Sequence, residues 1–213
     1  MAAKYRDRHE AGRMLAEDLR RYDGDRDVLV AGLPRGGVPP AYEVARSLRA
    51  ELDVLVIRKL GVPGNEELAM GAVARGGVRV LNRDVIAGMG ITAEQIETAA
   101  RREEHAVARR EEEYRGGRPP PRMEGRTVLA VDDGLATGAG MLAAVRALRQ
   151  YSPASIIAAV PVAAPEACRK VSQEADGVVC LKTPTPFSAV GAWYEDFSPV
   201  GDEEVKELLW QPA

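Results

Sequence analysis

The sequence predicts an α/β protein with a mostly parallel sheet and helices on both of its faces. Short, uninterrupted apolar runs alternate with segments whose apolar residues recur at helical spacing. Runs that are apolar at every position are typical of strands buried on both sides, and helices between them indicate parallel connections. The expected strands are 28–33, 54–57, 128–131, 156–162 and 178–181, and the expected helices are 7–22, 39–50, 142–148 and 166–173.

Two segments interrupt this alternation. Residues 71–82 read as two short strands around Gly76 and Gly77, which predicts a hairpin. Residues 92–115 predict a long charged helix, because Thr92 and Gln95 match a capping box and glycines follow its end.

The charged helix has few apolar positions, so we expect it to bury only a narrow stripe. The pattern leaves open whether this stripe lies on the helix's own domain or on a second subunit, as in a homo-oligomer. We expect a single domain over residues 1–213, with an insertion at about 71–121 and a small C-terminal segment at about 183–213.

Composition narrows the classes of function that the sequence allows. A net charge of −3 gives no reason to expect nucleic-acid binding. Only two cysteines occur, Cys168 and Cys180, so we expect no disulfide framework and a reducing cytoplasm. The first residues lack the apolar core of a signal peptide, and no uncharged stretch approaches the roughly 20 residues that span a bilayer. With only His9 and His105, any metal is expected to be a hard cation held by oxygen.

The most informative stretch is residues 128–140, Val-Leu-Ala-Val-Asp-Asp-Gly-Leu-Ala-Thr-Gly-Ala-Gly. A buried strand delivers Asp132 and Asp133 to the carboxyl edge of the predicted sheet, where open α/β folds bind ligands. Small residues then open a helix, whose first N–H groups and dipole favour an anion. One end of this site suits hydroxyls or a metal and the other suits a phosphate, so a sugar phosphate fits both. The alternative is that Asp-Asp-Gly merely ends a strand in a turn.

This stretch resembles the phosphoribosyl-diphosphate motif of the type I phosphoribosyltransferases, in which two acids follow an apolar run and precede a small residue, Thr-Gly and a final Ser or Thr. The resemblance implies that Asp132 and Asp133 bind the ribose 2′- and 3′-hydroxyls, with Mg²⁺ held by them directly or through water or ribose. It implies a 5′-phosphate loop made of Ala136, Thr137, Gly138, Ala139 and Gly140. Gly140 stands where the motif has its final Ser or Thr, so this chain lacks one hydroxyl donor to the phosphate.

A second loop, Pro34-Arg-Gly-Gly37, follows the first predicted strand. Its glycines permit unusual backbone angles and close approach of an anion, and Arg35 supplies charge. Alone, it is a common strand-to-helix turn. The resemblance implies that it is the family's pyrophosphate loop, including Gly36 and Gly37, with Arg35-Gly36 as the strained and often cis peptide bond.

Arg58 and Lys59 end the second predicted strand at the same edge of the sheet. A basic pair there is often only a solvated strand end, but the resemblance implies that it binds the pyrophosphate. Residues 60–70 are rich in Gly and Pro, and the resemblance implies a mobile loop that closes over the substrate; a plain surface loop is the alternative.

Aromatic residues gather near the C-terminus, in the segment that the resemblance identifies as a hood over the site. Phe187, Trp193 and Tyr194 are the candidates for stacking on a base, and core packing is the alternative.

The resemblance implies an enzyme in which a nitrogen nucleophile, from a nucleobase or related amine, displaces pyrophosphate from C1 of 5-phosphoribosyl diphosphate. Asp132, Asp133, Arg35 and Lys59 are the expected catalytic residues. In the family's 6-oxopurine enzymes an acid stands at the position of Ala136, so its absence argues against such a base.

Two other functions stay open. One is a regulatory module that binds phosphoribosyl diphosphate or a nucleotide without transfer; RNA is disfavoured because no basic, aromatic-lined face is evident. The other is a phosphatase or kinase of sugar phosphates, which is disfavoured because the sequence has no nucleophile motif or Walker loop.

Overall fold

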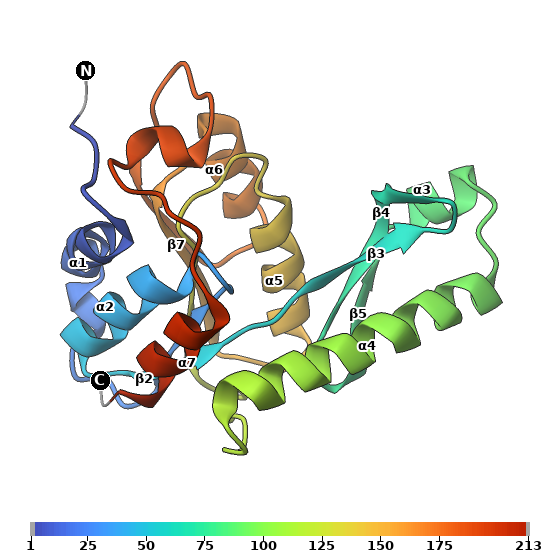
Figure 1. The fold of residues 1–213 in the computed structure, drawn as a ribbon, viewed down its shortest axis with the longest axis horizontal. Coiled ribbons are helices and arrows are strands. Elements are labelled where there is room, and N and C mark those ends of the chain that lie inside the picture. The colour runs from blue at the N-terminus through green and yellow to red at the C-terminus, as the bar shows by residue number, and fades with distance from the viewer. Residues whose placement is uncertain (1–2, 212–213) are drawn as a thin grey trace.

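The computed structural model describes residues 3–211 and is built around a five-stranded parallel sheet (Figure 1). The strand order is β2-β1-β6-β7-β8, and every neighbouring pair is parallel. The strands are β1 (Val28–Gly32), β2 (Glu51–Val54), β6 (Thr127–Val131), β7 (Ser155–Val162) and β8 (Gly177–Lys182). This confirms the predicted fold class, although β2 begins three residues before the predicted 54–57.

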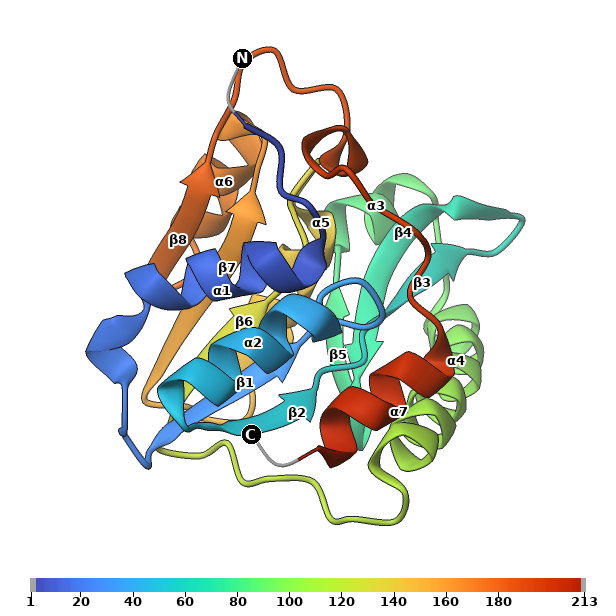
Figure 2. The same cartoon turned by 60° about the vertical axis from the view of Figure 1, so that its left-hand side comes forward.

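Helices cover both faces of this sheet, as predicted (Figures 1 and 2). The helices α1 (Arg8–Asp18) and α2 (Val38–Leu48) lie on one face, and α5 (Ala139–Arg149) and α6 (Pro165–Ser172) lie on the other. In β1, Val28 and Val30 pack against α1 and α2, whereas Leu29 and Ala31 pack against the opposite layer. Because side chains alternate between two faces that are both covered, every position of β1 is buried and none is polar.

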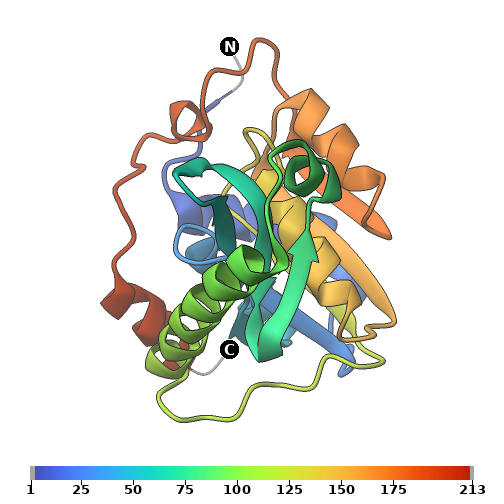
Figure 3. The same cartoon turned by 90° about the vertical axis from the view of Figure 1, so that its right-hand side faces the viewer.

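A second, antiparallel sheet projects from the first and carries a long helix (Figures 1 and 3). It consists of β3 (Arg58–Val62), β4 (Asn65–Ala74) and β5 (Val78–Leu81), with the turn η2 (Arg75–Gly77) between the last two. The predicted hairpin is therefore present. Residues 60–70 were predicted as a loop, and that assignment is wrong, because they form most of a β3–β4 hairpin with Pro63 and Gly64 at its turn. Their predicted mobility stays a prediction.

Buried apolar side chains explain that correction. Leu60 and Met70 are both fully buried, and Val62 is nearly so. They belong to one core cluster with α4 (Ala93–Arg115) and α7 (Asp202–Trp210), so the hairpin is anchored at its base, whereas residues 63–66 around its turn are exposed.

We expect Met70→Ala to destabilise the protein by about 2–5 kcal/mol, because it removes a large side chain from a core that can collapse only in part. Leu68→Ala is the matched control, since Leu68 is 37% exposed on the same strand. Urea unfolding measures both. Equal and small losses in the two variants would show that the hairpin contributes no core.

The long helix α4 begins and ends as predicted. Thr92 and Gln95 form the capping box, and Gly116 ends the helix with a φ of 58°. Its buried stripe contains Ala100, Val107 and Tyr114, which pack against the second sheet and α7. The buried stripe of α4 therefore packs on its own domain, which is the first of the two predicted alternatives.

Within residues 3–211, three short helices were not predicted, namely α3 (Arg83–Gly88), η3 (Val190–Trp193) and α7. The predicted helix 7–22 is present as α1 and, after Leu19, the short 3-10 helix η1 (Arg20–Tyr22). The helix α7 ends the C-terminal segment and lies beside α4, in contact with α2 as well (Figure 2).

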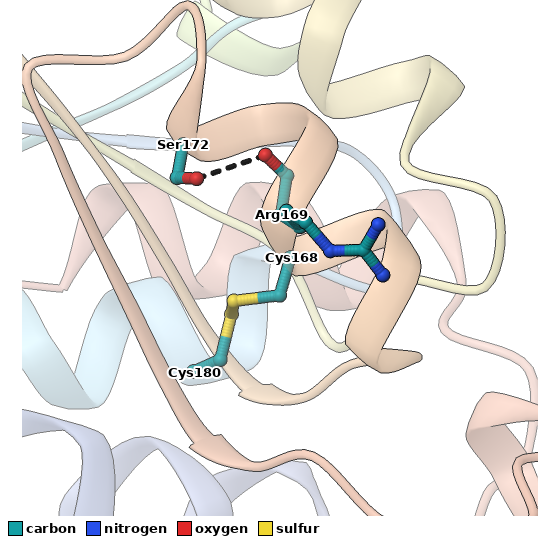
Figure 4. Close-up of a disulfide and its surroundings, with 4 residues drawn as sticks. All are labelled: Cys168, Arg169, Ser172 and Cys180. Atoms are coloured by element: carbon teal, nitrogen blue, oxygen red, sulfur yellow. Dashed lines mark hydrogen bonds between the residues drawn. A yellow bond between two sulfur atoms is a disulfide. The ribbon is translucent and has the colours of Figure 1, made fainter.

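The two cysteines form a disulfide between Cys168 of α6 and Cys180 of β8 (Figure 4). Their Cα atoms lie 6.8 Å apart, because α6 packs directly on the strand that follows it. The sequence predicted no disulfide framework, and this one bridge corrects that expectation. Across residues 3–211, no helix combines the length and the apolar character that crossing a membrane requires.

Candidate functional site

Two adjacent carboxylates occupy the carboxyl end of β6, as the sequence predicts. The backbone N–H of Asp133 donates a 2.9 Å hydrogen bond to Oδ1 of Asp132. The hydroxyl of Tyr194 donates to the Asp133 carbonyl at 2.7 Å, and Nε of Arg8 donates to Asp133 Oδ2 at 2.8 Å. Both acids are partly buried, so their positions are fixed by the strand and by these bonds.

Burial raises the pKa of Asp132 well above its ordinary value, and the adjacent charge of Asp133 raises it further. Burial also raises the pKa of Asp133, although the Arg8 guanidinium opposes this shift. The pair is therefore stabilised by any ligand that brings hydroxyl donors or positive charge to it.

Arg8 is a site residue that the sequence analysis missed. Its side chain is only 10% exposed, lies 3.8 Å from the centre of the Phe197 ring and donates from Nη1 to the Ser198 carbonyl at 2.9 Å. The first turn of α1 and the C-terminal segment thus hold it against Asp133 together. Because the ion pair joins residues 125 positions apart, no local pattern reveals it.

The Pro34–Gly37 loop lies directly against the two acids. A Cβ atom built on Gly36 would collide with Oδ2 of Asp133, and one built on Gly37 would lie 2.6 Å from the Val131 carbonyl oxygen. Neither glycine has a positive φ, so close approach is what requires them here. The cis peptide bond joins Pro34 and Arg35, which corrects the predicted Arg35-Gly36 bond by one residue.

The structure separates Arg58 from Lys59, which were predicted to act together. Arg58 lines a cavity of about 260 Å³ with Pro34 and Arg35, and its Nε donates to Glu103. Lys59 lines a different cavity, of about 210 Å³, between the second sheet and the start of α5. Successive side chains of β3 point to opposite faces, which explains the divergence.

The predicted 5′-phosphate loop does open a helix. Gly138 has a φ of 77° and precedes α5, and the Ala139 N–H donates to Thr137 Oγ1 at 3.3 Å. Ala136 and Gly140 are exposed, as are Thr137 and Ala139. Lys59 and Ala139 line the same cavity, so the lysine lies on the phosphate-loop side of the site.

The aromatic candidates favour the core-packing alternative. Tyr194 is 2% exposed, and its ring lies between those of Tyr5 and Phe197 at centroid distances of 5.5 and 5.1 Å. It is therefore not available as a stacking surface, which corrects that prediction. Phe187 and Trp193 are partly buried and pack against the same cluster.

The donors present suit a metal that is shared with a substrate. Within the part of the chain that the structure describes, no group of three or more His, Cys, Asp or Glu side chains could hold a metal ion. Mg²⁺ is commonly bound by one or two carboxylates, water and substrate phosphates. The Asp132–Asp133 pair, whose pKa values are raised by burial, fits that mode.

Comparison with known proteins identifies the family. The pattern of the phosphoribosyl transferase domain matches residues 4–195. The chain therefore belongs to the phosphoribosyl transferase domain family, as its resemblance to the type I enzymes predicted.

Particular relatives agree with this. Two Mycobacterium tuberculosis proteins, from strains CDC 1551 and H37Rv, are named provisionally as phosphoribosyl transferases and are 45% identical over 203 residues. The match covers 95% of this chain but 46% of theirs, so the chain spans about half their length. The crystal structure of TT1426 from Thermus thermophilus is 45% identical, covers 97% of both chains and has a TM-score of 0.85. The AQ2163 protein of Aquifex aeolicus is similar in fold, with a TM-score of 0.53, 15% identity and coverage of 95% of this chain and 85% of its own.

Proposed function

We propose that this chain transfers the phosphoribosyl group of 5-phosphoribosyl diphosphate to a nitrogen nucleophile, with Mg²⁺, and releases pyrophosphate. One observation carries the proposal. The Asp132–Asp133 pair packs directly on the Pro34–Gly37 loop, and the segment that follows the pair leads into the N-terminus of α5. A ligand at this edge meets acceptors for hydroxyls, an arginine-bearing loop and a helix N-terminus.

Each part of the ligand then has a partner. Asp132 and Asp133 accept hydrogen bonds from the ribose 2′- and 3′-hydroxyls, and residues 136–140 bind the 5′-phosphate through backbone N–H groups. Arg35 binds the leaving diphosphate. Positioning the reacting groups and neutralising the leaving group are the main contributions that a protein makes to such a displacement.

Mg²⁺ would be held by Asp132 and Asp133, directly or through water or ribose, and would supply positive charge to the diphosphate. The protein's own contribution is electrostatic as well. The partly buried acids place negative charge near C1 of the ribose, where positive charge develops as the bond to the leaving oxygen breaks.

The acceptor belongs to the nucleobases or related amines. Ala136 stands where the family's 6-oxopurine enzymes have an acid, which disfavours hypoxanthine and guanine. The test is a screen of nucleobases and amines with 5-phosphoribosyl diphosphate and Mg²⁺ that follows pyrophosphate release. Acceptor-dependent release supports transfer. Tight binding of 5-phosphoribosyl diphosphate without release for any acceptor would favour the regulatory module instead.

Gly140→Thr tests the phosphate loop. Gly140 has no positive φ, and beyond its chain neighbours and the backbone of its own helix no heavy atom lies within 4 Å of a Cβ built on it, so there is room for a larger side chain. A hydroxyl on a phosphate adds a charge-assisted hydrogen bond of roughly 1.5–3 kcal/mol at best, so ribose 5-phosphate should bind about tenfold more tightly. Calorimetry with ribose 5-phosphate and with ribose compares the two ligands. Equal effects on both would show that this loop does not hold the phosphate.

A further inference from the structure

Three arginines line the cavity of about 260 Å³ beside the Pro34–Gly37 loop, and they come from three separate parts of the chain. Arg35 comes from that loop, Arg58 from the start of β3, and Arg110 from the C-terminal part of α4. The remaining lining residues are Pro34, Val56, Ile57 and Tyr114. Arg110 lies in the insertion, and no sequence pattern connected it with the site.

Two acids pair with the arginines of this cavity, and they differ in how firmly they are held. Glu103 is 6% exposed, and burial raises its pKa, but hydrogen bonds from Arg58 and Arg102 outweigh that effect and keep its pKa below the ordinary value. Glu103 is therefore a fixed partner of Arg58. Asp202 differs, because its side chain is 38% exposed and sits in the first turn of the short terminal helix α7.

One oxygen of the Asp202 carboxylate lies close to two of the three arginines. Oδ1 accepts from Arg110 Nη1 at 2.5 Å and from the Tyr114 hydroxyl at 2.6 Å, and it lies 3.9 Å from Arg35 Nη1. The side chains of Arg35 and Arg110 are 51% and 38% exposed, so both can be reached from solvent. A carboxylate oxygen between two guanidinium groups occupies the position that an oxygen of a diphosphate would take.

We propose that Arg110 is a further binding residue for the leaving diphosphate and that Asp202 competes with this anion for Arg110 and Arg35. The inference rests on the proposed function, since it concerns the diphosphate end of the same substrate. The arriving diphosphate replaces the carboxylate on the two arginines. Asp202 then stays on the Tyr114 hydroxyl or turns to solvent.

The proposal predicts opposite effects for the two members of one ion pair. Inorganic pyrophosphate with Mg²⁺ is the probe, and calorimetry on the full chain gives its dissociation constant. Arg110→Gln should weaken binding about tenfold, because it removes a charge-assisted hydrogen bond of roughly 1.5–3 kcal/mol. Asp202→Asn should tighten binding severalfold, because it removes the competing charge. Arg109→Gln, on the neighbouring exposed residue of α4, should leave the dissociation constant unchanged.

A purely structural ion pair gives a different result. Both variants would then lose stability and neither would change pyrophosphate affinity, or both would weaken it alike; either outcome overturns the proposal. If Arg110→Gln does not fold, Asp202→Asn decides alone, since a failure to tighten binding contradicts competition.

Ribose 5-phosphate separates this inference from the proposed function. It lacks the diphosphate, so neither variant should change its affinity by more than twofold or so, by the usual additivity of separate contacts. Binding of ribose 5-phosphate without any binding of pyrophosphate would overturn the role of Arg110 and leave the proposed function standing. Absence of binding for both probes and for 5-phosphoribosyl diphosphate would overturn the proposed function as well.

Discussion

Replacing both acids of the site, Asp132→Asn with Asp133→Asn, should abolish binding of 5-phosphoribosyl diphosphate while the fold survives. Each carboxylate is expected to accept a hydrogen bond from a ribose hydroxyl, and a bond to a charged group contributes roughly 1.5–3 kcal/mol. Losing two such bonds weakens binding by roughly two to four orders of magnitude, at about 1.4 kcal/mol for each tenfold. Calorimetry with Mg²⁺ present measures this loss.

The same variant should be more stable than the wild type at neutral pH. Burial raises the pKa of both acids, so their ionisation costs stability in the folded protein. An acid with a raised pKa binds its proton more tightly when folded, and this lowers stability as pH rises from the ordinary range near 4 through the raised value. Neutral amides remove that cost.

A matched control has the same change of charge elsewhere. Asp25 and Asp27 are exposed and lie before β1, at the opposite edge of the sheet from the site. Asp25→Asn with Asp27→Asn should leave ligand affinity unchanged. Unchanged affinity in the Asp132 and Asp133 variant, with this control behaving as expected, would overturn the assignment of the acids to the ribose.

Arg8→Leu should destabilise the protein by about 3 kcal/mol at neutral pH, near the low end of the range for breaking a buried ion pair. The Arg8 and Asp133 side chains are 10% and 15% exposed, so solvent can compensate the stranded carboxylate only in part. Arg6→Leu is the control, because Arg6 is 64% exposed in its pair with Asp7 and should cost less than about 1 kcal/mol. Urea unfolding measures both variants.

The cost of Arg8→Leu should depend on pH in a defined direction. Without the guanidinium, the pKa of Asp133 rises further, so the cost is largest where Asp133 is ionised. It should shrink as pH falls through the raised pKa toward the ordinary range near 4, because a neutral carboxyl needs no partner. Adding Asp133→Asn to Arg8→Leu should recover most of the loss. A pH-independent cost that Asp133→Asn does not relieve would show that Arg8 acts only through its packing on Phe197.

The parts of the site that sequence reasoning located are those encoded locally. An apolar run followed by Asp132 and Asp133 places the acids at a strand end, and small residues after them place a helix N-terminus beside them. The five strands followed from the same kind of signal. The start of β2 was predicted three residues too late, because the apolar run at the end of this strand continues into the loop that leads to β3.

The parts that were missed depend on contacts between distant segments. Arg8 reaches Asp133 across 125 residues, and Arg110 reaches the site only because α4 returns across the second sheet. Residues 60–70 were predicted as a loop from their Gly and Pro content. Their anchoring depends instead on Leu60 and Met70, which become informative only when α4 and α7 are known to cover them.

The most direct test of the central claim is a crystal structure of the protein with 5-phosphoribosyl diphosphate and Mg²⁺. We predict the ribose 2′- and 3′-hydroxyls on Asp132 and Asp133, the 5′-phosphate within residues 136–140, and the diphosphate against the Pro34–Gly37 loop. A ligand bound in another cavity, or one whose ribose makes no contact with either acid, would contradict the account.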